Sequence, residues 1–160
     1  MHLLKRGAVL ALSILLMTQV SIAASYIAVT EPELENAVVL LHESNLFLGQ
    51  SHSVYMLEEG ESQILIDNIP GKVSALAVGD VNGDLQDDLV VGTGTAGALY
   101  FYIYRDSTWQ RHEQTQYLWD TIRRIEIHDF NNDGWGDVLL ITEKGEAQVL
   151  LSQEGLLQSF

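Results

Sequence analysis

Two short stretches of the chain carry oxygen-bearing side chains at the same alternating positions. These positions are 1, 3, 5 and 9 of each stretch, occupied by Asp80, Asn82, Asp84 and Asp88 in the first and by Asp129, Asn131, Asp133 and Asp137 in the second. Calcium takes about six to eight oxygen ligands in flexible geometry. A loop that adds the backbone carbonyl at position 7, here Gln86 or Trp135, can wrap such an ion. The spacing therefore predicts two calcium sites.

Other interpretations of these stretches fit less well. Magnesium prefers strict octahedral geometry with retained waters, and zinc prefers His or Cys ligands, which neither loop has at ligand spacing. Asp, Asn and Gly are also common in plain turns between strands. Two loops with the same spacing weigh against plain turns. Without a cation the neighbouring carboxylates would repel one another, so binding and local order are linked.

An EF-hand is excluded although DVNGD and DFNNDG both open like one. That loop needs an acidic residue at position 12, where this chain has Val91 and Leu140. It also needs flanking helices, whereas branched apolar strands are predicted here. Dockerin-type pairs fail for the same reason.

The two loops belong to an internal repeat. Residues 73–93 and 122–142 superpose without a gap at an offset of 49 residues. A third, worn copy begins at SYIAV if its loop is about three residues shorter. It would align Ile27 with Leu76 and Val38-Val39 with Val90-Val91. Its acidic ladder is reduced to Glu31, Glu33 and Glu35, and we expect no equivalent site there.

Each unit is predicted as strand, acidic loop and three further strands, because branched and aromatic residues alternate with turn residues. In the middle copy the strands are expected at 74–78, 89–92, 98–104 and 109–117. A unit of this size matches a propeller blade. The predicted fold is all-β, a partial β-propeller-like array of about three four-stranded antiparallel blades. Its parts are a degenerate repeat at 25–72, a repeat with the first loop at 73–121, and a truncated repeat with the second loop at 122–160.

The stretches GDVNGDLQDDLVVG and HDFNNDGWGDVLLI resemble the calcium loops of FG-GAP/VCBS-type repeats, the units of integrin-α-like β-propellers. The family pattern is approximately D-x-[DN]-x-D-G-x-x-D-[LV], and both loops match its acid and amide positions. The first loop departs at position 6, where Leu85 replaces the equivalent of Gly134. Since glycine relieves a left-handed backbone, we expect the first site to be either weaker or differently shaped, and the second site, from Asp129 to Asp137, to be the more secure. The resemblance implies an extracytoplasmic propeller with a binding or scaffolding role.

The N-terminus has the features of a secretory signal. Lys5 and Arg6 precede an apolar segment at 7–17, and small residues follow at 21–23. We expect a signal peptide at 1–23, cleavage near Ala23, and a secreted or periplasmic protein with no stable membrane span. The alternative is an N-terminal membrane anchor, because apolar character continues to Val29, although polar residues interrupt it.

Composition limits the partners and the sources of stability. A formal charge of −14 disfavours nucleic acids and anionic membranes. The chain has no cysteine, so an exported domain must rely on its core, on bound metal or on assembly. Three blades cannot close a ring, since propellers use about four or more. We expect two chains to supply six blades, with docking on a larger protein or an open array as alternatives.

No catalytic set is recognisable. No serine or cysteine nucleophile has a suitable context, GTGTAG at 92–97 lacks the lysine of a phosphate loop, and His128 simply precedes a loop. The expected function is non-enzymatic: protein interaction, adhesion or assembly, including self-association. One alternative is a lectin-like module that binds a glycan by stacking on Trp109 or Trp135. A polysaccharide-acting hydrolase or lyase has less support.

Overall fold

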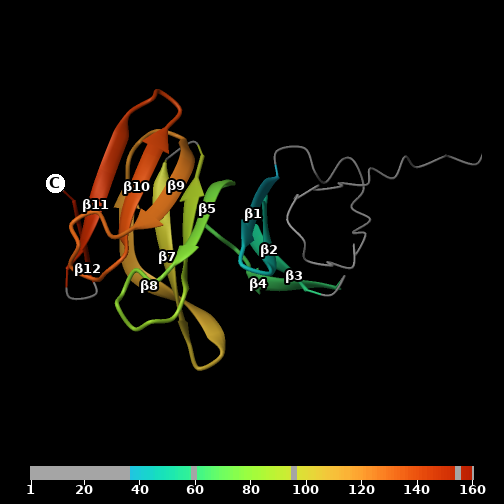
Figure 1. The fold of residues 1–160 in the computed structure, drawn as a ribbon. Helices are drawn as coiled ribbons and strands as arrows, with labels where there is room; N and C mark the ends of the chain where they lie inside the picture. Colours follow the sequence, from blue (N-terminus) through green and yellow to red (C-terminus); the bar gives the residue numbers. More distant parts are fainter. Residues whose placement is uncertain (1–36, 59–60, 95–96, 154–155, 160) are drawn as a thin grey trace, which may run out of the picture.

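The computed structural model describes residues 37–58, 61–94, 97–153 and 156–159, and this part of the chain consists of twelve β-strands with no helix (Figure 1). No helix able to cross a membrane occurs within these residues. The expected signal peptide and the worn ladder of Glu31, Glu33 and Glu35 lie outside the described residues.

The strands form three separate four-stranded antiparallel sheets, each built in chain order. The first sheet contains β1 (Val38–His42), β2 (Asn45–Gln50), β3 (Ser53–Glu58) and β4 (Glu61–Ile66). The second contains β5 (Val73–Gly79), β6 (Asp88–Thr93), β7 (Ala98–Arg105) and β8 (Thr108–Tyr117). The third contains β9 (Ile122–His128), β10 (Asp137–Thr142), β11 (Ala147–Gln153) and β12 (Leu156–Ser159). The predicted all-β, blade-like fold is confirmed.

Two details of the sequence prediction are corrected. The third sheet has a fourth strand, β12, where a truncated repeat was expected. In the first sheet, β1 and β2 contact β5 in the same way as β5 and β6 of the second sheet contact β9. The strand β1 is therefore equivalent to β5, the first strand of its repeat. The alignment of Val38-Val39 with Val90-Val91, in a second strand, is therefore wrong. The reason is that β1 and β2 are joined by the two-residue turn Glu43–Ser44. This turn is too short to carry the ladder of acids that marks the boundary between the first two strands in the other sheets.

The middle sheet is covered on both faces. The strands β5 and β1 lie side by side, as do β5 and β9, and Figure 1 shows the three sheets in succession. One apolar cluster joins the first and second sheets and includes Phe47, Val54, Leu76, Val91 and Tyr100. The other joins the second and third sheets and includes Ala75, Ala77, Val90, Ile125 and Leu140. Burial of these faces supplies the main stabilising term.

Glycine permits close approach at equivalent points of both sheet–sheet contacts. A Cβ atom on Gly49 of β2 would lie 2.5 Å from Val73 Cγ1, and one on Gly92 of β6 would lie 2.9 Å from Ile122 Cγ2. In each case the side chain of the next sheet fills the space that a larger residue would need. The absence of a side chain at these two glycines lets the following sheet pack closely, and we call the two positions glycine seats.

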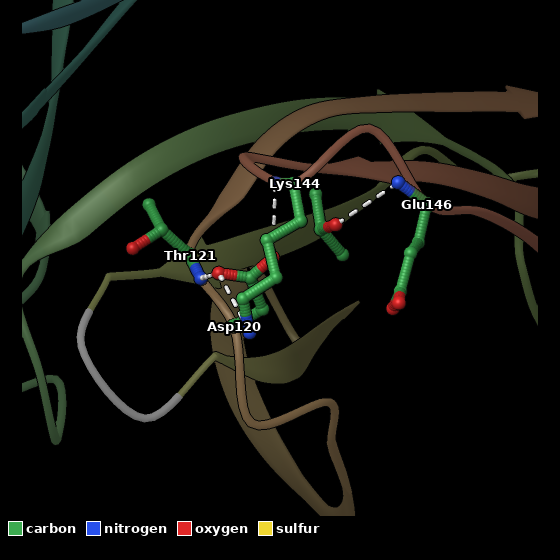
Figure 2. A network of polar contacts seen from close by, with 5 residues as sticks. Asp120, Thr121, Lys144 and Glu146 are labelled. Atoms are coloured by element: carbon green, nitrogen blue, oxygen red, sulfur yellow. Dashed lines mark hydrogen bonds and ion pairs between the residues drawn. The ribbon is translucent and has the colours of Figure 1, made fainter.

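The connection between the second and third sheets is fixed by Asp120 (Figure 2). Its carboxylate accepts hydrogen bonds from the backbone N–H of Thr121 at 2.9 Å and of Lys144 at 3.1 Å, in the β10–β11 turn. The bond from Lys144 lowers the pKa of Asp120. In the same turn the N–H of Glu146 donates to Thr142 Oγ1 at 3.3 Å.

Candidate metal centre

The two acidic loops occupy equivalent places in consecutive sheets. The first joins β5 to β6, and the second joins β9 to β10. The final acid of each loop starts the second strand and pairs across the sheet with the residue before the loop: Asp88 with Gly79, and Asp137 with His128. Strands therefore flank both loops, which confirms the rejection of an EF-hand.

In the first loop the side chains organise the backbone. Asp80 accepts hydrogen bonds from the N–H groups of Asn82 (3.2 Å), Gly83 (2.7 Å) and Leu85 (2.8 Å). The Asn82 side-chain oxygen accepts from the Asp84 N–H at 2.8 Å, and the Asn82 amide donates to Asp84 Oδ2 at 3.1 Å. Such turns order the loop locally.

The second loop repeats this arrangement. Asp129 accepts from the N–H groups of Asp133 (3.1 Å) and Gly134 (2.8 Å). Asn131 accepts from the Asp133 N–H at 3.0 Å and donates to Asp133 Oδ2 at 2.8 Å. The bond from Gly134 lowers the pKa of Asp129. The equal spacing in the sequence thus corresponds to similar local geometry, in which the first acid accepts from the N–H of position 6 in both loops.

The ninth residue of each loop is buried. Asp88 and Asp137 are both 0% exposed. Asp88 accepts from the N–H of Val81 at 3.3 Å and of Tyr104 at 3.1 Å. Asp137 accepts from the N–H of Phe130 and of Ser152, both at 2.8 Å. Each acid therefore ties its loop to the third strand of its own sheet.

Burial of Asp88 is unfavourable for its charged form. Removal from water raises its pKa from 3.8 to about 6, although hydrogen bonds from Tyr104 and Val81 act in the opposite direction. The nearby charges of Asp84 and Asp80 raise it further. A cation at this loop would offset that unfavourable energy, since an opposite charge favours the ionised carboxylate.

Positions 4 and 6 of both loops have left-handed backbone. In the first loop these are Gly83 (φ 78°) and Leu85 (φ 65°), and in the second they are Asn132 (φ 60°) and Gly134 (φ 92°). Leu85 therefore adopts the conformation that the sequence pattern reserves for glycine, with a side chain 92% exposed. Apart from glycine, which has no side chain, and Asn and Asp, residues rarely take this conformation.

The two loops contact each other through Trp135 and Gly136. The Gly136 N–H donates to the Asp80 carbonyl at 3.1 Å, and the Trp135 indole lies against Gly83, where a Cβ atom would be 2.6 Å from its Nε1. The Ser152 hydroxyl, also buried, lies 3.1 Å from the Val81 carbonyl and 2.8 Å from that of Gly136. The first loop is therefore held by the following repeat.

A side-chain contact with the first sheet completes the surroundings of the first loop. His42 Nε2, at the end of β1, lies 2.8 Å from Asp87 Oδ2. Asp87 is the acid of the first loop that falls outside the ladder. The first loop is thus in contact with residues of both neighbouring sheets.

The donor chemistry of both loops fits calcium. Positions 1, 3, 5 and 9 carry carboxylate and amide oxygens, and the backbone carbonyls of Gln86 and Trp135 at position 7 would complete each predicted set. Among residues 37–58, 61–94, 97–153 and 156–159, no three His, Cys, Asp or Glu side chains converge as a metal site. In this conformation the ladder acids accept backbone hydrogen bonds instead.

Four aromatic residues lie in different surroundings, and two of them, Trp109 and Trp135, are the predicted glycan-stacking residues. Trp109 is half-buried against Tyr104, with ring centroids 5.0 Å apart, and Trp135 packs on Gly83. Trp119 is 77% exposed and stacks on Tyr117, which is 52% exposed, at 5.9 Å. Tyr117 and Trp119 therefore form an exposed aromatic pair, whereas Trp109 and Trp135 are half-buried.

Comparison with protein families identifies these loops. Residues 80–140 match the model of the FG-GAP-like repeat, and the match spans both ladders. The match covers less than half of the chain and shows that this region is similar to an FG-GAP-like repeat. A comparison with curated proteins finds no match to the chain. The family resemblance of the two loops is thereby confirmed.

The contacts between the two loops were not predictable from the sequence. Gly83 and Trp135 are 52 residues apart, and no pattern in either loop indicates that they touch. The glycine at position 4 had one visible signal, since Gly83 stands where the second repeat has Asn132. That difference is explained by the indole, which leaves no room for a side chain at Gly83.

Proposed function

We propose that this chain is an exported, calcium-stabilised binding module with no catalytic role, acting in protein interaction, adhesion or assembly. The observation that carries the proposal is the pair of all-oxygen loops with equal geometry in consecutive FG-GAP-like repeats. The features of a secretory signal at residues 1–23 support export, and the sequence offers no nucleophile or phosphate loop.

The ligands proposed for each ion are the four ladder side chains and one carbonyl. Asp80, Asn82, Asp84, the Gln86 carbonyl and Asp88 form the first set; Asp129, Asn131, Asp133, the Trp135 carbonyl and Asp137 form the second. Bound calcium would neutralise the clustered carboxylates. Asp84 and Asp133 are exposed, so both are free to turn from their backbone bonds. Asp88 and Asp137 are already fixed by theirs.

Calcium at the first loop is expected to stabilise the contact between the second and third sheets. The Asp80 carbonyl and Gly83 contact Gly136 and Trp135 of the next repeat. Ordering the first loop therefore orders part of this junction. In the proposed role, calcium keeps the array rigid while its surfaces bind a partner.

Thermal unfolding with calcium and with chelator tests the proposal. At about a hundredfold excess over its dissociation constant, calcium should add about 2.7 kcal/mol of stability per site. Asp84→Ala and Asp133→Ala should each remove one equivalent of bound calcium, whereas Glu113→Ala, an exposed acid on β8, should remove none. Equal melting temperatures with calcium and chelator would contradict the proposal.

Glycan binding is the second candidate, favoured by the exposed stack of Tyr117 and Trp119. Aromatic rings with a free face are suited to packing against sugar rings. A glycan array followed by titration should detect binding that Trp119→Ala abolishes and Trp109→Phe preserves. An array with no signal would remove this candidate and leave the calcium proposal intact.

A further inference from the structure

The first sheet has one apolar face that no other described sheet covers. Its inner face packs on the second sheet through Phe47, Val54 and Ile66. The opposite face carries two rows set by the strand register: Val39, Leu48, Tyr55 and Ile64, then Leu41, Leu46 and Leu57. We call these seven residues the outer face. It contains no charged side chain. Val39, Leu41 and Ile64 are 47%, 50% and 56% exposed, Leu46, Leu48 and Tyr55 are half-buried, and Leu57 is 8% exposed.

The free face of the third sheet differs because it combines charged with apolar side chains: Leu139 and Val149 lie in the same row as Glu126. Where the second sheet presents Ala75, Ala77 and Gly92 to the third sheet, the third sheet has Arg124, Glu126 and Ile141 at the same offset of 49 residues. Arg124 and Glu126 form an ion pair, with side chains 66% and 43% exposed. The glycine seat is replaced by a branched side chain.

These differences argue against association of the first sheet of one copy with the third sheet of another. Such a head-to-tail contact would bury the Arg124–Glu126 pair against Val39 and Leu41, and burying charges in an apolar contact is costly. Ile141 would also occupy the space that Gly49 and Gly92 leave for a following sheet. A six-bladed ring of two chains is therefore disfavoured.

We propose that two copies of this chain associate through the outer face, first sheet against first sheet, about a two-fold axis. A two-fold contact must be self-complementary, and a face with only apolar side chains meets this requirement without pairing like charges. Sheet-on-sheet packing of the same kind already joins the three sheets within the chain. The proposal rests on the assembly role proposed above and names its surface and partner.

Solution mass measured over a range of concentrations tests the dimer. The purified protein should be dimeric, and Val39→Lys and Ile64→Lys should each weaken association roughly tenfold or more, because each places a charge in the contact. Both positions are at least 47% exposed, so folding should be preserved, as circular dichroism would show. Arg124→Ala, on the third sheet, is the matched control and should leave the dimer unchanged.

Cross-linking distinguishes the arrangement, since the chain has no cysteine of its own. Ile64→Cys should give a covalent dimer with a flexible bis-maleimide. A monomeric protein, loss of the dimer in Arg124→Ala, or linkage between mixed Val39→Cys and Arg124→Cys chains would each overturn the proposal. So would a monomer in which Cys at position 64 resists maleimide, since the same chain would then cover the face. Calcium-dependent melting without a dimer would refute only this inference.

Discussion

The two acidic loops have the same internal geometry but different surroundings. Both have the N–H of position 6 bonded to the first acid and the N–H of position 5 bonded to Asn at position 3, and both end in an acid with 0% exposure. At position 2, however, Val81 is 4% exposed within the core between the second and third sheets, whereas Phe130 is 45% exposed. The first loop is enclosed by contacts with the next repeat, and the second loop has an open side.

This difference separates two roles that one motif can serve. In the first loop, Gly83 and the Asp80 carbonyl join consecutive repeats through Trp135 and Gly136. The second loop has glycine at position 6, the residue best suited to the left-handed backbone found there, and its surroundings constrain it less. We therefore expect substitutions in the first loop to disturb the junction between sheets, and those in the second loop away from Trp135 and Gly136 to act mainly within its own sheet.

The largest contrast is expected from removing the buried acids. Asp137→Ala leaves two N–H groups unpaired whose bonds are 2.8 Å long, and should destabilise the chelated protein by about 4 kcal/mol. Asp88→Ala should cost about 2 kcal/mol, because its bonds are 3.1 and 3.3 Å and its buried charge is unfavourable. Urea unfolding measures both losses. Equal losses would show that burial of the Asp88 charge carries no cost.

Much of each repeat could be predicted because its signals are local. Branched and aromatic runs place the strands of the second sheet within about one residue of those observed, and the ladder spacing places both loops. The strands of the first sheet were harder to predict, since the two-residue turn Glu43–Ser44 carries no ladder of acids to mark where the first strand ends. The seats at Gly49 and Gly92 and the contact of Trp135 with Gly83 depend on neighbours distant in sequence, which no local pattern encodes.

The second contrast uses matched glycines. Gly83→Ala and Gly134→Ala both place a side chain at positive φ, which should cost about 1 kcal/mol in each case. Only Gly83→Ala also collides with the Trp135 indole, 2.6 Å from the new Cβ, and should cost about 1 to 2 kcal/mol more. Urea unfolding gives the energies, and tryptophan fluorescence should shift in Gly83→Ala alone. Equal losses and equal spectra would mean that the indole does not hold the first loop.

The third contrast is the response to pH. Asp88 has a folded pKa raised from 3.8 to about 6, so its contribution to stability is fully present below 3.8 and is lost as pH rises through about 6. Asp129 has a lowered pKa, so its contribution is present above 3.8 and is lost as pH falls below that value. Unfolding of the chelated protein over this range should show the loss with rising pH, and Asp88→Asn should abolish it. Parallel curves for the two proteins would contradict the assignment to Asp88.

The smallest contrast isolates the strain at position 6 of the first loop. Leu85 has φ 65° and a side chain 92% exposed, so Leu85→Gly should relieve about 1 kcal/mol while removing little buried surface. Glycine also makes the unfolded chain more flexible, which costs roughly 0.5 to 1 kcal/mol, so the net change should be close to zero. Gln86→Gly, at ordinary φ, should show the flexibility cost alone. The difference between the two variants in urea unfolding therefore measures the strain, and equal destabilisation would mean that Leu85 is accommodated without strain and that the two loops differ only in their surroundings.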